Sequence, residues 1–357
     1  MALEYHPLKV AKIEPIAQDA VGLWLDIPTH LAETFVFKPG QHLSLRHTIG
    51  DKELRRFYSI CSLENTNQLR IGVRHIEDGR FSGFLNQKIK PGDTLEVLAP
   101  RGRFCLQETA RAKHILAFAA GSGITPIFSQ LQNHLSADDD STATLVFGNR
   151  STKTIMLRRD LNDLKDRYLG RFETLHTLSR EQQDIEFLNG HIDKALIEQL
   201  TEKSLIAPNS AAQILICGPA QMIDNVQSTL LGLGVDAEKI SLERFNVAKP
   251  TGKPSKQVQK NLSEGAKISI VLDGVEQAFS ISDPNDTVLS AAEKSRIELP
   301  FSCAGGMCAT CRCKLIEGEV EMAQNYALEP WELEAGYVLA CQSRPTTPKI
   351  RLDFDAI

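Results

Sequence analysis

The chain has 357 residues, of which 42% are hydrophobic and 24% charged, with a formal net charge of −5. This length suits two or three globular domains, and the composition excludes a disordered chain. The negative net charge indicates no basic surface for nucleic acid. The longest apolar runs, such as Ile115–Ala120, are far shorter than the ~20 residues of a membrane span. The first residues lack a secretory signal pattern. We therefore expect a cytoplasmic protein that binds neither nucleic acid nor membrane.

Residues 1–106 contain strand-like runs without intervening helices, separated by turns at Pro39-Gly40, Pro91-Gly92 and Pro100-Arg101-Gly102. This pattern predicts an antiparallel β-barrel. Within it, Arg55-Arg56-Phe57-Tyr58-Ser59 offers cations for a phosphate, an aromatic ring that can stack on a flat ligand, and a hydroxyl that can hydrogen-bond to it. Gly79-Arg80-Phe81-Ser82 can begin a helix at a second phosphate. Taken alone, each motif is more often a plain strand or turn than a ligand contact.

Residues 107–245 alternate short apolar runs with amphipathic stretches. We expect strands over His114–Ala120, Ala143–Phe147, Phe172–Leu178, Gln213–Cys217 and Lys239–Phe245, and helices over Ile155–Leu169 and Ala220–Leu233. Such alternation predicts a doubly wound, Rossmann-like parallel sheet that binds its ligands at the carboxyl ends of the strands.

The segment Ala120-Gly121-Ser122-Gly123-Ile124-Thr125-Pro126 follows the first of these strands. Its two glycines let the backbone approach a pyrophosphate, and the start of the helix that follows favours an anion. The segment departs from G-x-G-x-x-G because Pro126 takes the place of the last glycine. An ordinary tight turn is the alternative interpretation.

Two further strand ends carry candidate nucleotide contacts. Gly148-Asn149-Arg150-Ser151 has no carboxylate for a ribose 2′-hydroxyl but has a cation and a hydroxyl for a 2′-phosphate, so we expect NADPH, with NADH as the alternative. Arg150 could instead be a solvated loop charge. At Cys217-Gly218-Pro219 the turn would leave Cys217 near a nicotinamide, and a buried structural cysteine is the alternative.

Residues 246–264 are rich in Lys and Pro and have no apolar period, which predicts a linker. Beyond it, Cys303, Cys308, Cys311 and Cys341 follow the C-x4-C-x2-C…C spacing of a plant-type [2Fe–2S] cluster. Structural zinc or buried apolar cysteines are the alternatives. Cys313 lies two residues beyond Cys311 in a strand pattern and is expected to pack rather than to bind metal.

The flanks of the cysteine cluster predict a small β-rich domain over residues 265–357. Lys267–Leu272 and Val275–Ile281 form a hairpin pattern around Asp273-Gly274, and Asp286 is expected to cap a helix that runs to Ser295. These residues carry 8 basic and 14 acidic side chains. We expect Glu317, Glu319 and Glu321 to lie along one strand face and guide docking of a partner, or to be simply solvated.

Taken together, the motifs Arg56-Phe57-Tyr58-Ser59, Gly79-x-x-Ser82, Gly121-x-Gly123-Ile124-Thr125-Pro126 and Cys217-Gly218-Pro219 resemble the ferredoxin–NADP⁺ reductase superfamily. The appended cysteine cluster resembles that of electron-transfer reductases of multicomponent oxygenases. Leu54–Cys61, Gly148–Ser151, Leu242–Asn246, Cys308–Cys313, Asn325–Pro330 and Ala335–Gln342 resemble the reductase components of phenylacetyl-CoA oxygenases. The resemblance spans essentially the whole chain. It implies FAD in the barrel, NADPH on the Rossmann-like domain, a β-grasp ferredoxin domain with one [2Fe–2S] cluster, and a di-iron oxygenase of phenylacetate degradation as electron acceptor.

The resemblance also implies residue roles. For FAD these are Arg56 at the phosphates, Tyr58 stacked on the isoalloxazine, Ser59 near N5, Phe57 at a position that the pattern leaves free, Ile71, Gly72, Val73 and Arg74 along the cofactor, and Gly79, Phe81 and Ser82 at the pyrophosphate. For NADPH they are Gly121, Gly123 and Thr125 at the pyrophosphate, Arg150 and Ser151 at the 2′-phosphate, and Cys217, Gly218 and Pro219 by the nicotinamide. Ser59, Cys217 and Glu243 would be catalytic, with Phe245 closing the reductase part, and Cys303, Cys308, Cys311 and Cys341 would ligate the cluster.

The expected activity is electron transfer from NADPH through FAD and the cluster to the oxygenase, because the cofactors supply the redox chemistry and the protein supplies orientation and electrostatics. Two alternatives remain at this level. One is an NADH-dependent reductase of a Rieske-type or other multicomponent oxygenase. The other is a non-catalytic iron–sulfur carrier or sensor.

Overall fold

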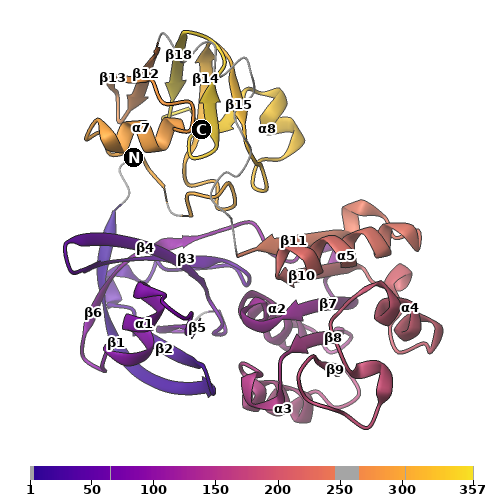
Figure 1. Cartoon of the computed structure of the whole chain (residues 1–357). Helices are drawn as coiled ribbons and strands as arrows, with labels where there is room; N and C mark the ends of the chain where they lie inside the picture. Colours follow the sequence, from indigo (N-terminus) through magenta and orange to yellow (C-terminus); the bar gives the residue numbers. More distant parts are fainter. Residues whose placement is uncertain (1–3, 65, 246–264, 302, 357) are drawn as a thin grey trace. The chain divides into compact units, whose positions relative to one another are not determined.

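The computed structural model describes residues 4–64, 66–245, 265–301 and 303–356 (Figure 1). Contacts divide the described residues into two compact units, one of Tyr5–Phe245 and the other of Glu4 and the described residues from Gly265 to Ala356. The expected linker over residues 246–264 lies outside the described residues. The expected domain boundary between residues 106 and 107 lies inside the first unit, so it stays a prediction.

The N-terminal part of the first unit is an antiparallel sheet that closes on itself. Its strands hydrogen-bond in the order β4-β3-β6-β1-β2-β5. Closure comes from an antiparallel bridge between Ile60 and Ile71 and from the Cys61 N–H, which donates to the Arg70 carbonyl at 2.7 Å. The barrel is filled by alternate strand residues such as Leu8, Leu23 and Leu43, and this confirms the expected antiparallel flavin-type domain. The elements are β1 (Tyr5–Ala17), β2 (Ala20–Asp26), β3 (His42–Ile49), β4 (Lys52–Ser59), β5 (Gln68–Arg74), α1 (Arg80–Gln87) and β6 (Thr94–Arg101).

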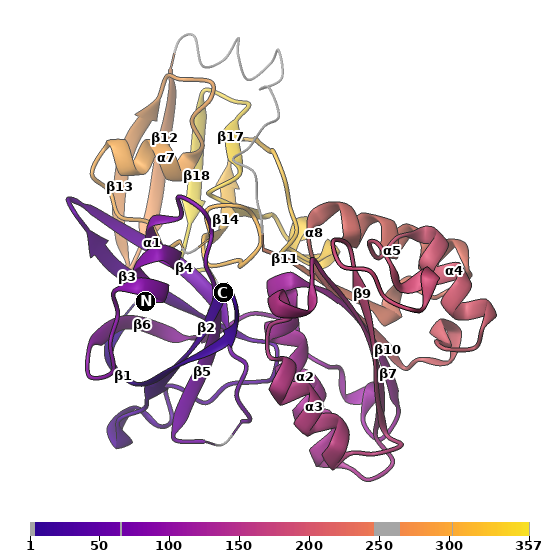
Figure 2. The ribbon, with the colours of Figure 1, turned by 60° about the horizontal axis from the view of Figure 1, so that its bottom comes forward.

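The second part of the first unit is a parallel sheet with the order β11-β10-β7-β8-β9. Helices cover both of its faces (Figure 2), with α2 and α3 packed on one and α4 and α5 on the other. The strand order reverses between β7 and β10, which is where such folds bind ligands. The elements are β7 (His114–Ala120), α2 (Ile124–Ala137), β8 (Thr142–Asn149), α3 (Arg158–Arg167), β9 (Phe172–Leu178), α4 (Lys194–Glu202), β10 (Gln213–Gly218), α5 (Ala220–Gly232) and β11 (Ile240–Arg244).

One helix is shorter than expected. The sequence pattern predicts a helix from Ile155, but α3 begins at Arg158, because Thr152–Thr154 form a separate 3-10 turn and Leu157 has a φ of +57°. A left-handed residue cannot continue a right-handed helix. By contrast, α5 ends within one residue of its expected limit.

Arg70 joins the barrel to the parallel sheet inside the first unit. Its guanidinium, on β5, pairs with Glu14 of β1 at 2.8 Å and makes a two-pronged hydrogen bond with Asp160 of α3. The ring of Trp24 lies 5.2 Å from the guanidinium carbon. Because Arg70 is only 5% exposed, these bonds are poorly screened by water and fix α3 against the barrel.

The second unit is a mixed sheet of order β13-β12-β18-β14-β16 with α7 against it and a small β15-β17 pair. The hairpin of β12 and β13 turns at Asp273-Gly274 as expected, and β12 also pairs parallel to β18. This is the ferredoxin-type domain that the cysteine spacing predicts. The elements are β12 (Ala266–Leu272), β13 (Val275–Ile281), α7 (Val288–Lys294), β14 (Arg312–Glu317), β15 (Val320–Met322), α8 (Pro330–Glu334), β16 (Tyr337–Leu339), β17 (Ser343–Pro345) and β18 (Lys349–Asp353).

Two expectations for this unit are wrong in detail. Thr287, not Asp286, caps α7 by accepting from the Ser290 N–H, while Asp286 binds Lys294. Glu317 and Glu321 do not share one strand face, because Gly318 at φ +86° ends β14 and turns the chain into β15. Glu317 is also paired with Lys349 at 3.2 Å.

None of the described helices combines the length and hydrophobicity that crossing a lipid bilayer requires.

Candidate functional site

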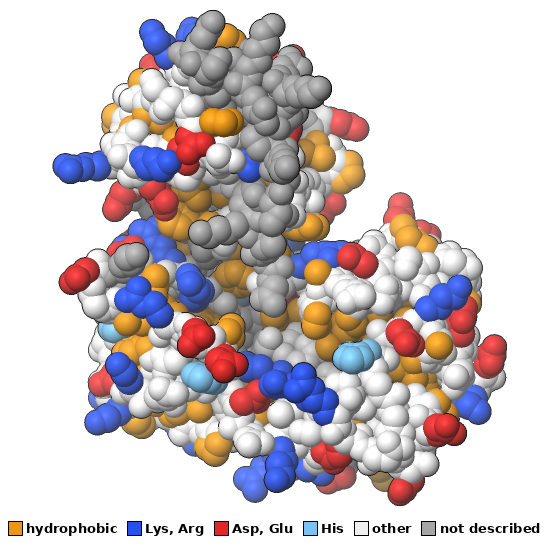
Figure 3. All heavy atoms as spheres, viewed as in Figure 1, with side chains coloured by type: hydrophobic (Ala, Val, Ile, Leu, Met, Phe, Trp, Pro, Cys, Tyr) orange, Lys and Arg blue, Asp and Glu red, His pale blue; other side chains and the backbone are white. Residues whose placement is uncertain are grey.

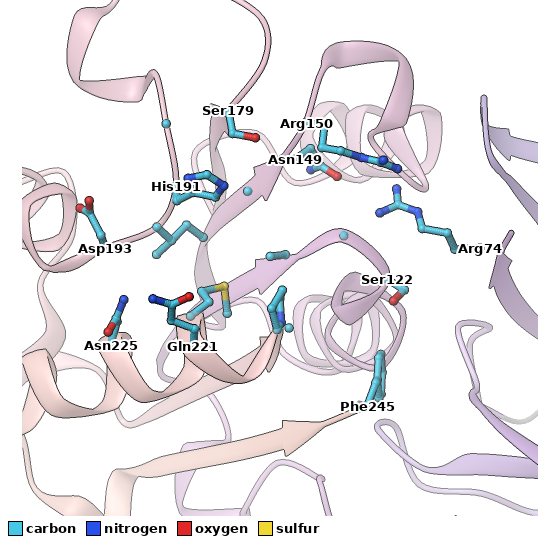
Figure 4. A pocket seen from close by; sticks show the side chains of 18 residues that line it. Arg74, Ser122, Asn149, Arg150, Ser179, His191, Asp193, Gln221, Asn225 and Phe245 are labelled. Atoms are coloured by element: carbon cyan, nitrogen blue, oxygen red, sulfur yellow. The ribbon is translucent and has the colours of Figure 1, made fainter. Parts of the chain in front are cut away.

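A cavity of about 650 Å³ opens at the carboxyl ends of β7, β8, β9 and β10, the edge that the strand alternation singles out (Figure 4). In the space-filling view, lysine and arginine side chains lie beside a hollow of the first unit (Figure 3). A volume of this size can hold much of a nucleotide. The lining residues are Arg74, Ala120, Gly121, Ser122, Gly148, Asn149, Arg150, Ser179, Gly190, His191, Ile192, Asp193, Gly218, Pro219, Gln221, Met222, Asn225 and Phe245.

In the glycine segment after β7, some residues line the cavity and others pack against neighbouring backbone. Gly121 lines the cavity at φ +58°, a conformation that glycine adopts without strain. Gly123 faces the other way, because a Cβ there would lie 2.1 Å from the Cys217 carbonyl oxygen. Thr125 is buried and its hydroxyl donates to the Ser122 carbonyl at 3.0 Å. Gly123 and Thr125 therefore hold the loop in place, and Gly121 and Ser122 present it to a ligand.

The end of β8 supplies polar groups suited to a nucleotide. Asn149 is 8% exposed, lines the cavity, and neither its Oδ1 nor its Nδ2 has a partner among the described residues. A buried amide without partners is costly unless a ligand bonds to it. Arg150 lies beside it, half-exposed and paired with Asp19. Ser151 does not line the cavity, because its side chain caps the turn Thr152–Thr154.

The Cys217-Gly218-Pro219 motif reaches the cavity only through its last two residues. Cys217 is fully buried, and burial followed by the nearby Glu243 carboxylate raises the pKa of its thiol well above the usual range. Cys217 and Glu243 are register partners on β10 and β11. Burial raises the pKa of Glu243 to about 8, and its Oε2 has no hydrogen-bond partner in the described part of the chain. At neutral pH the carboxyl is therefore mainly protonated and can donate a hydrogen bond.

On the barrel, β4 carries the expected flavin residues. Ser59 is 2% exposed and its hydroxyl has no partner among the described residues, which fits a ligand atom such as a flavin nitrogen. Tyr58 is mostly buried, with its ring 6.3 Å from that of Phe81. Arg56 is exposed at the surface, where a phosphate could reach it. Phe57 contacts Phe245 edge-to-face at 6.3 Å, so it links β4 to the end of β11.

Other predicted flavin residues are occupied by packing. Ile71, Val73 and Phe81 belong to the barrel core. A Cβ on Gly72 would lie 2.7 Å from the Thr125 side chain. Ser82 bonds to the Ile76 N–H and the Gly79 carbonyl and so shapes the start of α1. Any contact that these residues make with FAD would come from their backbone, and those roles stay predictions. Arg74 is the exception in this group, because it lines the nucleotide cavity.

The four cluster cysteines lie together in the second unit as two pairs. The thiol of Cys303 hydrogen-bonds to Cys308 and lowers the pKa of Cys308 to about 6, and Cys311 likewise lowers the pKa of Cys341. No three His, Cys, Asp or Glu side chains of the described residues are arranged around one metal ion. Two pairs of thiols are the donor set that the two irons of a [2Fe–2S] cluster require.

Backbone amides surround these sulfurs. The N–H groups of Gly305 and Met307 donate to Cys303 at 3.3 and 3.4 Å, and the N–H of Cys303 donates to Cys308 at 3.4 Å. Such bonds stabilise thiolates. Gly306, at φ +78°, lies so close to Gln342 that a Cβ would be 3.0 Å from it. Cys313 is fully buried in the strand, where it packs as expected.

Several cavity residues carry no recognisable sequence motif. Ser179 follows β9 and could have been found by tracing every strand to its carboxyl end. Asn149, the last residue of β8, lies in the predicted segment Gly148–Ser151, but no role is predicted for its amide. His191 and Asp193 come from the loop before α4, and Gln221 and Asn225 from the first turns of α5 (Figure 4). Asp19 does not line the cavity but contacts two residues that do, Arg74 and Arg150, because the barrel folds against the sheet.

Comparisons with known proteins match this geometry. Three family models fit the chain: an oxidoreductase FAD-binding domain over residues 7–105, an oxidoreductase NAD-binding domain over residues 118–228, and a 2Fe-2S iron-sulfur cluster binding domain over residues 270–346. A subunit of 1,2-phenylacetyl-CoA epoxidase from Escherichia coli (strain K12) is 41% identical over 99% of this chain and 98% of its own length. The ferredoxin reductase component of 3-ketosteroid-9-alpha-monooxygenase from Rhodococcus rhodochrous is 30% identical over 97% and 96%. The solved structure of phthalate dioxygenase reductase shares the fold, with a TM-score of 0.60, 22% identity and 98% coverage of both chains.

Proposed function

We propose, from the premise that this chain belongs to the family of oxygenase reductase components with FAD-binding, NAD-binding and 2Fe-2S domains, that it carries electrons from NADPH to a di-iron phenylacetyl-CoA epoxidase. The observation that carries the choice of acceptor is the 41% identity, over 99% of the chain, to a subunit of this epoxidase from Escherichia coli. The family is one of NAD(P)H-dependent oxidoreductases that contain FAD and a [2Fe–2S] cluster. The preference for NADPH, the acceptor and the individual residue roles are the proposed part.

The chain's own residues position the reactants. Hydride acceptance would be the chemistry that FAD supplies in the barrel, and one-electron transfer the chemistry that a cluster held by Cys303, Cys308, Cys311 and Cys341 supplies. Asn149, Arg150 and Gly121 would hold the adenosine and pyrophosphate parts of the nucleotide at the strand ends, with Gly218 and Pro219 beside the nicotinamide. Ser59 would bond to the flavin edge, and the protonated Glu243 would hold a proton next to Cys217.

The test is electron delivery by the FAD- and cluster-containing protein. Under anaerobic conditions NADPH should reduce both cofactors, and with purified phenylacetyl-CoA epoxidase oxygenase the complete system should form the CoA-thioester epoxide in air. The oxygenase component of a 3-ketosteroid monooxygenase is the comparison acceptor. Faster turnover with the steroid oxygenase, or none with the epoxidase, would contradict the proposed acceptor. Failure of either nicotinamide nucleotide to reduce the flavin would contradict the reductase activity itself.

We also place the protein in the cytoplasm. None of the eight cysteines, all of which lie in the described part of the chain, is in a disulfide, which suits a reducing compartment. Fractionation of cells that produce the tagged protein should recover it with a cytoplasmic marker, and recovery with periplasmic or membrane markers would contradict this assignment.

A further inference from the structure

A carboxylate lies between the two arginines of the nucleotide cavity. Asp19 occupies the turn between β1 and β2, and its Oδ2 accepts from Nη2 of Arg150 at 2.8 Å. Its Oδ1 lies 3.4 Å from Nε of Arg74. Both arginines line the cavity, and their guanidinium groups point toward one another (Figure 4). The guanidinium groups of Arg74 and Arg150 could together bind an anionic ligand, but the carboxylate of Asp19 already lies between them.

The turn that carries Asp19 is held rigidly. The Gln18 N–H donates to the Lys153 carbonyl at 2.9 Å, and the Asp19 carbonyl accepts from the His75 N–H at 2.8 Å. The first bond attaches the barrel hairpin to the loop after β8, and the second attaches it to the residue that follows β5 of the barrel. Asp19 consequently cannot leave Arg150 by a simple shift of the turn, and a competing anion must displace its side chain alone.

Arg74, Arg150 and Asp19 differ in their exposure and in the other bonds that they make. Arg74 is largely buried and also donates to the Thr154 carbonyl, while the Arg150 side chain is 50% exposed and that of Asp19 only 23%. Burial, partly offset by Asp19, lowers the pKa of Arg74, and repulsion by Arg150 lowers it further. The guanidinium of Arg150 is thus the part of the site that a ligand can reach from solvent. The residue before it is Asn149, whose side-chain amide has no partner among the described residues.

We propose that Asp19 sets the choice between NADPH and NADH by competing with the nucleotide's 2′-phosphate for Arg150. A phosphate arriving at Arg150 meets a carboxylate already bonded there, and like charges repel at this distance. A ribose 2′-hydroxyl meets an acceptor to which it can donate. Asp19 therefore reduces, without reversing, the preference for NADPH that a contact with Arg150 would give, and it leaves NADH binding unopposed. This inference rests on the proposed function, because it assigns the adenosine end of the nucleotide to this part of the cavity.

The test compares binding of adenosine 2′,5′-bisphosphate and adenosine 5′-monophosphate to the FAD- and cluster-containing protein by isothermal titration calorimetry. Asp19→Asn removes the charge but keeps the shape. We expect it to bind the bisphosphate about tenfold tighter, the effect of one lost charge–charge contact near a surface, and the monophosphate within about twofold of wild type. Asp139→Asn is the matched control, since Asp139 is an exposed carboxylate, outside the cavity lining, that pairs with Arg171.

A second variant, Asp19→Ser, guards against misfolding of the first and should change the ratio of the two affinities in the same direction. An unchanged ratio in both variants, or weaker bisphosphate binding, would overturn the inference and make Asp19 a positioning residue for Arg150. If the wild-type protein bound neither compound nor either nicotinamide nucleotide, the nucleotide site itself would be wrong, and the fault would lie with the proposed function.

Discussion

At the scale of single residues, Glu243 shows that burial can shift the pKa of a carboxyl in a way that no sequence motif indicates. The resemblance implies a catalytic role for Glu243, but Leu242-Glu243-Arg244-Phe245 has by itself no pattern beyond that of a strand end. Only the fold places Glu243 in register with Cys217 and leaves its Oε2 without a partner in the described part of the protein. Desolvation then disfavours the charged form and raises the pKa to about 8.

This raised pKa predicts a pH-dependent stability. Below pH 4.5, the usual value, the group is neutral in both states and costs nothing. As pH rises toward about 8, the unfolded chain ionises first, so folding loses stability until the folded group ionises as well. Glu243→Gln removes this loss. The melting temperature of the variant minus that of wild type should be about 5 °C larger at pH 9 than at pH 5. Differential scanning fluorimetry at the two pH values measures this difference.

The exposed Glu238, close to Glu243 in the chain, supplies the control. Glu238→Gln should show the same melting difference from wild type at both pH values. A pH-independent effect of Glu243→Gln would mean that Glu243 ionises normally in the folded protein.

Two cysteines close together in the chain, Cys308 and Cys313, should respond differently to substitution by serine. Cys308→Ser should abolish the visible absorbance of the cluster while NADPH still reduces the flavin, because the cofactors lie in separate domains. Cys313→Ser should keep that absorbance and lower stability by about 1–2 kcal/mol, the cost of burying a hydroxyl where the thiol packs. Absorption spectra and urea unfolding distinguish the two. Loss of the cluster in Cys313→Ser would make Cys313 a ligand.

At the scale of elements, prediction from sequence succeeds where local pattern decides. The strands His114–Ala120 and Phe172–Leu178 match the expected limits, because a buried parallel strand is an unbroken apolar run bounded by polar residues. The start of α3 was not predictable, since the left-handed Leu157 depends on the barrel: its N–H donates to the Ile16 carbonyl at 3.1 Å. His191 was not predictable for a similar reason, because its loop takes position only from tertiary packing, whereas Ser179 directly follows a predicted strand.

The junction of β7 and α2 gives an element-level prediction. Gly123→Ala would place a methyl group 2.1 Å from the carbonyl of Cys217 and force α2 away from β10. We expect a loss of about 2–3 kcal/mol in the free energy of unfolding and weaker nucleotide binding.

Gly232→Ala is the matched control, since a Cβ at this position, the last residue of α5, meets nothing within 4 Å. It should be neutral or stabilising by up to about 1 kcal/mol. Urea denaturation followed by tryptophan fluorescence measures both variants. Equal stability of Gly123→Ala and wild type would show that the loop can move aside.

At the scale of the whole molecule, two units with separate hydrophobic cores should unfold separately. We expect two calorimetric transitions in the cluster-containing protein. Removal of the cluster should lower one of them by about 10 °C or more, because a bound group stabilises only the unit that holds it. The transition of the flavin-containing unit should stay within about 2 °C, in keeping with its independent core. Equal shifts of both transitions, or one merged transition, would show that the units are coupled.

The clamp made by Arg70 has a consequence for the energetics of each catalytic cycle. Its bonds to Glu14 and Asp160 fix the flavin domain against the nucleotide domain when the chain folds, before any ligand arrives. The entropy of aligning donor and acceptor rings is thus lost once, during folding, and is not lost again at each encounter with a nucleotide. The encounter must then order only the nucleotide and the side chains that meet it.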